Sequence, residues 1–195
     1  MGSKRVPQVD SQMSAQQPRW LIALMAPPEV DRWASQMIQE LSDRYHTRTA
    51  RVSPHVTLQA PFHWPREQIP ALEQALAQFT SEYAPIPIQL SGFGSFGKKV
   101  LYIHVEKSQE LMTLQSGLAQ HLAEQFQIVD PKAQFRSFSP HMTVASRKLT
   151  PQTFDQAWQY LQKYSVDVRY VSDRLTLLIY DDHQWHLQRD FLLLP

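Results

Sequence analysis

Two short segments of the sequence repeat each other and divide the chain into two similar halves. Residues 53–59 read SPHVTLQ and residues 139–145 read SPHMTVA, so each segment holds Ser-Pro-His-x-Thr followed by an aliphatic residue. The two histidines, His55 and His141, lie 86 residues apart. Because a match this short also arises by chance, it indicates a duplicated fold only if the elements around each copy correspond.

The elements predicted around the two motifs follow the same order. Hydrophobic periodicity and β-branched runs predict a strand, a helix, the motif strand, a helix and a strand in each half. In the first half these lie at 20–25, 30–45, 52–62, 69–79 and 85–90; in the second half they lie at 100–105, 108–126, 138–145, 151–161 and 166–171. The first strands are offset by 80 residues (20 to 100), the motif histidines by 86 and the closing strands by 80 (86 to 166). The repeat therefore predicts a duplicated structural unit.

This order defines the expected fold class. It is α+β, with two pseudo-twofold-related β-α-β-α-β lobes around a central cleft. We expect residues 19–195 to form a single bilobal domain after a flexible leader at 1–18. Its parts are lobe 1 at about 19–91, lobe 2 at about 98–172 and an added C-terminal hairpin at about 173–195.

Alternation along a strand places the polar residues of each motif on one face. His55 and Thr57 point to one side, while Val56 and Leu58 point to the core. The same parity places His141 and Thr143 together. Each motif strand thus presents an imidazole and a hydroxyl about 7 Å apart, the rise of two strand residues.

Two such strands side by side would bring two imidazoles and two hydroxyls into one cleft. One imidazole can act as general base and the other as general acid, because the unperturbed pKa of histidine lies near neutrality. The hydroxyls can donate hydrogen bonds to the non-bridging oxygens of a phosphoryl group. These groups fit in-line displacement at phosphorus without a metal ion. The alternative is that both histidines are structural, which their matched contexts disfavour.

The motifs HVTL (55–58) and HMTV (141–144), each preceded by proline, resemble those of the 2H phosphoesterase superfamily. That superfamily includes the bacterial RNA 2′,3′-cyclic phosphodiesterases, also called 2′-5′ RNA ligases, and the resemblance extends from Trp20 onward. It implies that His55 and His141 are the acid and base, in an order the sequence does not assign. It also implies that Thr57 and Thr143 bind phosphate.

Three further residues are candidates for substrate binding. Relatives often carry a basic residue just after the second motif, which makes Arg147 a candidate for phosphate contact. Phe62 and Tyr102 could stack on a base, with core packing as the alternative for each.

The activity implied by the resemblance is that of a metal-independent phosphodiesterase with no cofactor. Its substrates would be 2′,3′-cyclic phosphates of RNA ends or nucleotides, or 2′-5′ linkages. A binding module for RNA ends or nucleotides with little turnover is one alternative, and a hydrolase of signalling cyclic oligonucleotides is another. Some relatives follow the first motif with an Arg-Phe-Leu-Gly-like run, whereas this chain has QAPF at 59–62, which leaves the substrate open.

Composition excludes several other classes of protein. The chain has no cysteine, which excludes disulfides and cysteine-ligated zinc, and its net charge of +1 gives no case for coating nucleic acid in bulk. No apolar run is long enough to span a bilayer. We expect a cytoplasmic monomer whose partners are RNA ends or a small nucleotide, without a membrane.

Two superficial motifs are interpreted as loops. GFGSFG (92–97) matches a dinucleotide-binding pattern, but it precedes a strand instead of a helix, so we expect a loop beside the cleft, followed by Lys98 in a solvated turn. His183 and His186 lie at a hairpin turn beside two aspartates, where a solvated loop is expected and no metal site.

Overall fold

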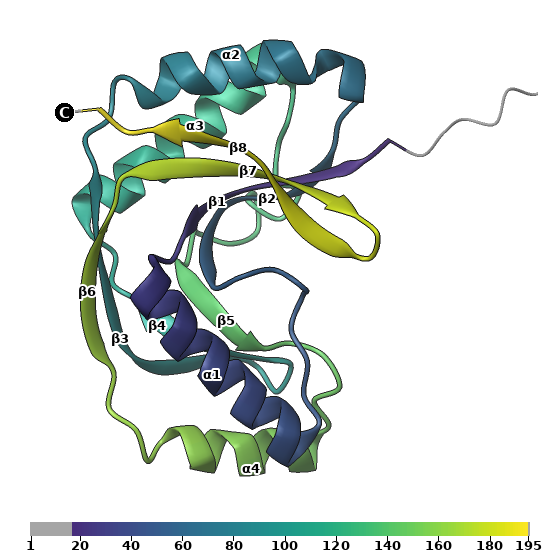
Figure 1. Cartoon of the computed structure of the whole chain (residues 1–195), viewed down its shortest axis with the longest axis vertical. Helices are drawn as coiled ribbons and strands as arrows, with labels where there is room; N and C mark the ends of the chain where they lie inside the picture. Colours follow the sequence, from purple (N-terminus) through teal and green to yellow (C-terminus); the bar gives the residue numbers. More distant parts are fainter. Residues whose placement is uncertain (1–16, 195) are drawn as a thin grey trace, which may run out of the picture.

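The computed structural model describes residues 17–194, and its elements follow the order expected from the sequence (Figure 1). Residues 1–16 of the expected leader lie outside the described residues. The elements are β1 (Arg19–Met25), α1 (Pro28–Tyr45), β2 (His55–His63), the 3₁₀ helix η1 (Arg66–Gln68), α2 (Ile69–Thr80), β3 (Ile86–Phe96), β4 (Val100–Val105), α3 (Gln109–Phe126), β5 (His141–Ala145), α4 (Pro151–Leu161), β6 (Asp167–Ser172), β7 (Arg174–Asp181) and β8 (Gln184–Leu192).

The strands form two antiparallel sheets of four, which confirms the α+β class. The first sheet has the order β2-β1-β7-β8 and the second the order β5-β4-β3-β6. Helices α2 and α3 lie on the side of the first sheet, and α1 and α4 lie on the side of the second (Figure 1). Each long helix therefore packs against the sheet of the other half: α1 contacts β5, and α3 contacts β2.

Strand β3 of the first repeat lies in the second sheet, and β7, which continues from β6 of the second repeat, lies in the first sheet. The first half of β3 pairs with β6 from Ile86↔Ser172 to Ser91↔Asp167, a ladder that is symmetric about its centre. The second half of β3 pairs with β4, and β7, which follows β6 after a single residue, pairs with β1. Figure 1 shows β6 and β7 as one bent ribbon beside β3.

The sheets therefore divide the chain differently from the expected lobe boundaries near residues 91 and 98. Strand β3 belongs to the second sheet, and the hairpin β7–β8 completes the first sheet instead of being an addition to the fold. The physical reason is that β1 and β4 are central strands. Each has its own motif strand on one side and needs a partner from the other repeat on the other side.

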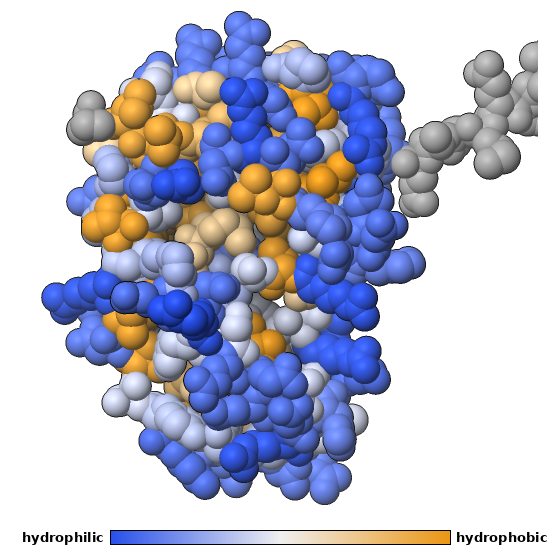
Figure 2. Space-filling view, viewed as in Figure 1, coloured by the Kyte–Doolittle hydropathy of each residue, from blue (hydrophilic) through white to orange (hydrophobic). Residues whose placement is uncertain are grey.

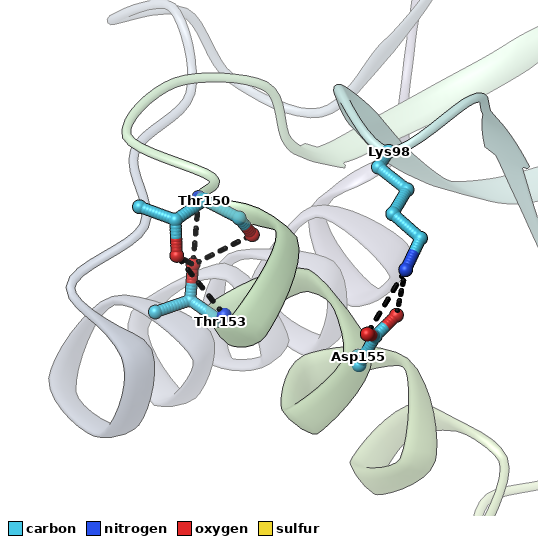
Figure 3. Close-up of polar contacts among 4 residues, drawn as sticks. All are labelled: Lys98, Thr150, Thr153 and Asp155. Carbon is cyan, nitrogen blue, oxygen red and sulfur yellow. Dashed lines mark hydrogen bonds and ion pairs between the residues drawn. The ribbon is translucent and has the colours of Figure 1, made fainter.

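Corresponding helices of the two repeats also have similar lengths and ends. Helices α1 and α3 each have 18 residues, and each ends at a residue in the left-handed region: His46 with φ 55° and Gln127 with φ 56°. The Ser108 hydroxyl accepts a hydrogen bond from the Leu111 N–H, as expected for an N-cap. Thr150 likewise caps α4 through a reciprocal capping box with Thr153 (Figure 3).

One hydrophobic core runs through both halves of the molecule. The apolar faces of all four helices meet core-facing strand residues from both sheets, and many of these side chains are fully buried. The motif neighbours Val56, Leu58, Met142 and Val144 are all buried here, which confirms the predicted strand parity. Side chains from both halves therefore contribute to the same buried cluster.

The glycine-rich stretch 92–97 is mostly strand, so the expected loop is wrong. Residues up to Phe96 belong to β3 and pair with β4 after a bulge between Leu90 and Phe93. Gly94 lies directly opposite Tyr102, and a Cβ at this position would overlap the Tyr102 ring. Glycine is therefore required here because an aromatic ring lies against the backbone. The turn that follows carries Lys98, whose ammonium contacts both carboxylate oxygens of Asp155 at 2.8 and 2.9 Å (Figure 3).

We expect Gly94→Ala to lower the free energy of unfolding by about 1–3 kcal/mol, the usual cost of forcing an extra group into a packed site. In a Tyr102→Ala background the same change should be neutral or slightly stabilising, because alanine restricts the unfolded chain more than glycine does. Urea denaturation of the wild type, both single variants and the double variant measures the difference. An equal loss in both backgrounds would show that the ring is not the obstacle.

Candidate active site

The two motif strands are edge strands that meet at the centre of the molecule. Strand β2 is at one edge of the first sheet and β5 is at one edge of the second, and the two strands contact each other. His55, Thr57, His141 and Thr143 are half-buried while their neighbours in sequence are buried. The structure therefore brings the motif strands together with their polar residues away from the core. In the space-filling view, hydrophobic residues show through between hydrophilic ones across the middle of the molecule (Figure 2).

Each motif histidine is held by the serine two residues before it. The Nδ1–H of His55 donates to the Ser53 carbonyl oxygen at 2.8 Å, and the Nδ1–H of His141 donates to the Ser139 carbonyl oxygen at 2.8 Å. A carbonyl oxygen can only accept, so Nδ1 carries the proton in both rings. The intervening prolines are buried and favour an extended conformation at the serine. Both neutral rings therefore keep Nε2 free as a proton acceptor.

Burial lowers the pKa of both histidines below the ordinary value of 6.5. The hydrogen bond to Ser53 opposes this effect on the pKa of His55, and the charge of His141 adds to it. The hydrogen bond to Ser139 likewise opposes the effect on the pKa of His141, and the charge of Arg136 adds to it. Both imidazoles are therefore mainly neutral at pH 7 when no anion is bound, and His141 is close enough for its charge to act on His55.

A cavity of about 640 Å³ opens beside His141; His55 and Thr143 are not part of its lining. Its lining joins both motif strands: Thr57 comes from β2 and His141 from β5, with Phe96 of β3, Gln115 of α3 and Arg136 of the α3–β5 loop. The Gln115 amide also donates to the Leu58 carbonyl oxygen at 3.3 Å, which ties α3 to the edge of β2. The cavity has the size and mixed polarity of a small-molecule site.

Aromatic rings surround His141 on the side of the second sheet. The centroid of Tyr102 lies 5.3 Å from that of His141, and Phe96 meets the same imidazole edge to face at 4.9 Å. Phe96 and Tyr102 are themselves 4.5 Å apart. Tyr102 thus lies beside a motif residue but is not part of the cavity lining, and its role in substrate binding stays a prediction. These contacts also fix the His141 ring plane.

The other two substrate-binding candidates lie elsewhere. Phe62 is 8% exposed and belongs to the core, opposite Trp20 of β1, so it does not reach the cavity. Strand β5 ends at Ala145, and the backbone of Arg147 then bridges to Arg48 of the α1–β2 loop. Arg147 is exposed and is not part of the cavity lining.

Within residues 17–194, no group of three or more histidine, aspartate and glutamate side chains is arranged to hold a metal ion. The polar residues around His183 lie in the exposed β7–β8 turn. No helix in the described part of the chain is long and apolar enough to cross a membrane.

Two cavity residues, Arg136 and Gln115, were not among the candidates from sequence. Gln115 lies on the polar face of a helix, where a glutamine is ordinary. Arg136 lies in an irregular loop five residues before His141, where no periodic pattern predicts the direction of a side chain. Only the path of the loop in space shows that Arg136 belongs to the site.

Comparison with known proteins places the chain in a family. The model of the 2′-5′ RNA ligase superfamily matches residues 26–184, a range that includes both motifs. The chain belongs to the 2′-5′ RNA ligase superfamily. This confirms the family resemblance carried by His55, Thr57, His141 and Thr143.

Members of the superfamily are similar to this chain over most of their length. A Bacillus licheniformis protein named "putative phosphoesterase" is 27% identical over 82% of this chain and 94% of its own length. A Thermus thermophilus protein of known structure aligns over 90% of this chain and 97% of its own, with a TM-score of 0.64 and 18% identity. Escherichia coli LigT complexed with NADP⁺ aligns over 93% of this chain and 100% of its own, with a TM-score of 0.62 and 16% identity. At these identities the two structures support the bilobal fold.

Proposed function

We propose that this chain is a phosphodiesterase that hydrolyses 2′,3′-cyclic phosphates of RNA ends or nucleotides, or 2′-5′ linkages, by two-histidine acid–base catalysis without a metal ion. The observation that carries the proposal is the matched pair of imidazoles. Each is fixed by the equivalent serine carbonyl and each keeps Nε2 free. The charge of His141 acts on His55, and the motif strands that carry Thr57 and Thr143 contact each other. Binding alone does not require two titratable groups of this kind.

The reaction removes one proton from the attacking water and delivers one proton to the leaving ribose oxygen. The base histidine accepts a proton from water at Nε2 while the water oxygen attacks phosphorus. The bond from phosphorus to one ribose oxygen breaks, and the acid histidine, protonated at Nε2, donates its proton to that oxygen. Thr57 and Thr143 donate hydrogen bonds to the non-bridging oxygens as charge develops there. The product is a phosphate monoester beside a free ribose hydroxyl, and exchange with solvent restores both rings.

Relatives give independent support for the substrate class. Structures of Escherichia coli LigT have been solved in complex with 3′-AMP, with ATP and with phosphate. These ligands share a phosphate group, and the first two share a nucleoside. A cavity of about 640 Å³ beside His141 is large enough for a ligand of that class.

A substrate panel tests the proposal directly. The protein is incubated with 2′,3′- and 3′,5′-cyclic nucleotides, 2′-5′ and 3′-5′ dinucleotides and cyclic dinucleotides, with and without EDTA. We expect turnover of a 2′,3′-cyclic phosphate or a 2′-5′ linkage that EDTA does not reduce, and the oxygen that keeps the phosphate identifies the bond cleaved. Tight binding of a 2′,3′-cyclic nucleotide that is never consumed would instead support a binding module.

The lowered histidine pKa values predict an acidic pH optimum. Activity needs one imidazole neutral and the other protonated, a combination that is most abundant between the two pKa values. Because both pKa values lie below the ordinary 6.5, the bell-shaped profile of kcat/KM should peak below pH 6.5 and fall as the acid loses its proton at higher pH. Initial rates from about pH 4 to pH 9 measure it, and a maximum above about pH 7.5 would contradict the assignment.

The same lowered pKa values make the folded protein less stable at low pH. At a given pH below about 6.5, the unfolded histidines bind more protons than the folded ones, so the free energy of unfolding decreases as the pH falls. Circular dichroism at each pH therefore separates loss of activity from loss of folded protein.

A further inference from the structure

The loop between α3 and β5 breaks the symmetry of the two repeats. Helices α1 and α3 end at equivalent positions, but the α3–β5 loop (residues 127–140) has 14 residues, whereas the α1–β2 loop (residues 46–54) has 9. The additional residues precede only one of the two motif strands, β5. They form one wall of the cavity through Asp130, Ala133, Arg136 and Phe138.

This wall encloses more space than a reacting phosphoryl group needs. From His141 the cavity extends along Thr57, Gln59 and Ala60 of β2 to α3, away from the centre between the two motifs. Its lining includes the aromatic rings of Phe96 and Phe138 and the amide of Gln115. A neighbouring part of the substrate, joined to the reacting phosphate, can occupy this extension.

Arg136 is the positive charge of this wall. Its charge acts on His141, so the guanidinium lies near the catalytic centre. Among residues 17–194, no carboxylate forms an ion pair with Arg136; Asp130, on the same wall, instead accepts the backbone N–H of Lys132 at 2.9 Å. The guanidinium is therefore available to an anion, and its planar donors suit phosphate.

Phe135, the residue before Arg136, is 82% exposed. The backbone N–H of Phe135 donates to the Lys132 carbonyl oxygen at 3.0 Å, so the side chain is presented from a folded turn. Val129, in the same loop, is 59% exposed. Phe135 lies outside the cavity lining, next in sequence to Arg136, so its ring is open to a base that extends beyond the cavity. Proteins bind single-stranded nucleic acid through aromatic rings that stack on bases together with basic side chains that contact phosphates.

We propose that the α3–β5 loop binds the nucleotide that precedes, on the 5′ side, the nucleoside carrying the reacting cyclic phosphate. The Arg136 guanidinium would contact the phosphodiester that joins the two, and the Phe135 ring would lie against the base of the preceding nucleotide. The preferred substrate is then the end of an oligoribonucleotide instead of a free cyclic mononucleotide. The inference rests on the proposed function for its chemistry.

The test compares two substrates that differ by this one nucleotide: 2′,3′-cyclic AMP and the dinucleotide ApA ending in a 2′,3′-cyclic phosphate. The measured quantity is the ratio of kcat/KM for the dinucleotide to that for the mononucleotide. We expect Arg136→Gln and Phe135→Ala each to lower this ratio by about tenfold, the scale of one stacked base or one charged phosphate contact. Lys132→Gln removes the same charge from the same loop at a residue that the proposed site does not use, and it should leave the ratio unchanged.

Salt dependence gives a second readout. Loss of one phosphate contact to a single strand should reduce the slope of log kcat/KM against log salt by about 0.7 for the dinucleotide in Arg136→Gln. Equal losses on both substrates would place Arg136 on the reacting phosphate and overturn the inference, as would an unchanged ratio.

Binding separates this inference from the proposed function. If the wild type hydrolyses neither substrate, the proposed function fails, and calorimetric titration with ApA carrying a 3′-phosphate decides the inference alone. Weaker binding in Arg136→Gln and Phe135→Ala, with Lys132→Gln unchanged, supports the site. Equal affinity in all four proteins overturns it.

Discussion

Replacing either His55 or His141 with alanine should lower kcat by about 10²–10⁴-fold, the usual contribution of a positioned acid or base. Each histidine is the first residue of its edge strand and is held by its own serine carbonyl. Neither ring is therefore positioned to take over the proton transfer of the other. Steady-state hydrolysis of the best substrate from the panel measures the loss. His63→Ala is the matched control, since His63 lies at the far end of β2 and also donates from Nδ1 to a carbonyl, that of Gln17 at 2.8 Å.

A change of leaving group should separate the two roles. A phosphodiester with a p-nitrophenyl leaving group needs little protonation of the departing oxygen, so the variant without the acid should recover most of its activity on it, and the variant without the base should not. Burial and a neighbouring charge disfavour the protonated form of both rings. The variant that recovers therefore identifies the acid, and the variant that does not recover identifies the base. Recovery of neither variant would contradict a division of labour between the two rings.

The second large effect concerns the two threonines. Thr57→Val and Thr143→Val remove a hydroxyl with little change in shape, and each should lower kcat by about 10²-fold, as the loss of one donor to a developing oxyanion does. Thr57→Ser and Thr143→Ser keep the hydroxyl and should retain most of the activity. Inhibition by inorganic phosphate should weaken in the valine variants alone. If the serine variants lose as much as the valine variants, the methyl group matters and the hydroxyl does not bind phosphate.

Most of the fold could be predicted because its elements carry local patterns. The apolar stripe of α1, the cap at Ser108 and the Thr150-Pro151 start of α4 depend on residues within one or two turns, and the structure has each where it was predicted. Strand parity likewise placed His55 and Thr57 on the face opposite Val56 and Leu58.

The remainder depends on contacts between distant segments. Glycines at 92, 94 and 97 weaken the strand pattern, yet β3 continues through Phe96 because β4 supplies the hydrogen bonds and Tyr102 needs the space above Gly94. No local sequence pattern predicts that β3 pairs in the second sheet and β7 in the first. Arg136 reaches the site only because the path of its loop returns to β5, and Phe62 leaves it because β1 places Trp20 opposite.

The placement of β3 in the second sheet and β7 in the first has a consequence for how such a chain could have originated. A half-length ancestor holding only the first repeat could not complete its own sheet, since β1 requires a neighbour that its own repeat sends away. Two copies that exchanged their last strands would complete both sheets and bring two identical histidines together across a true twofold axis. Fusion of the two copies into one chain would then have allowed the two copies of each loop to differ in sequence and length. The longer α3–β5 loop is such a difference, because in a dimer of identical chains both copies would carry it.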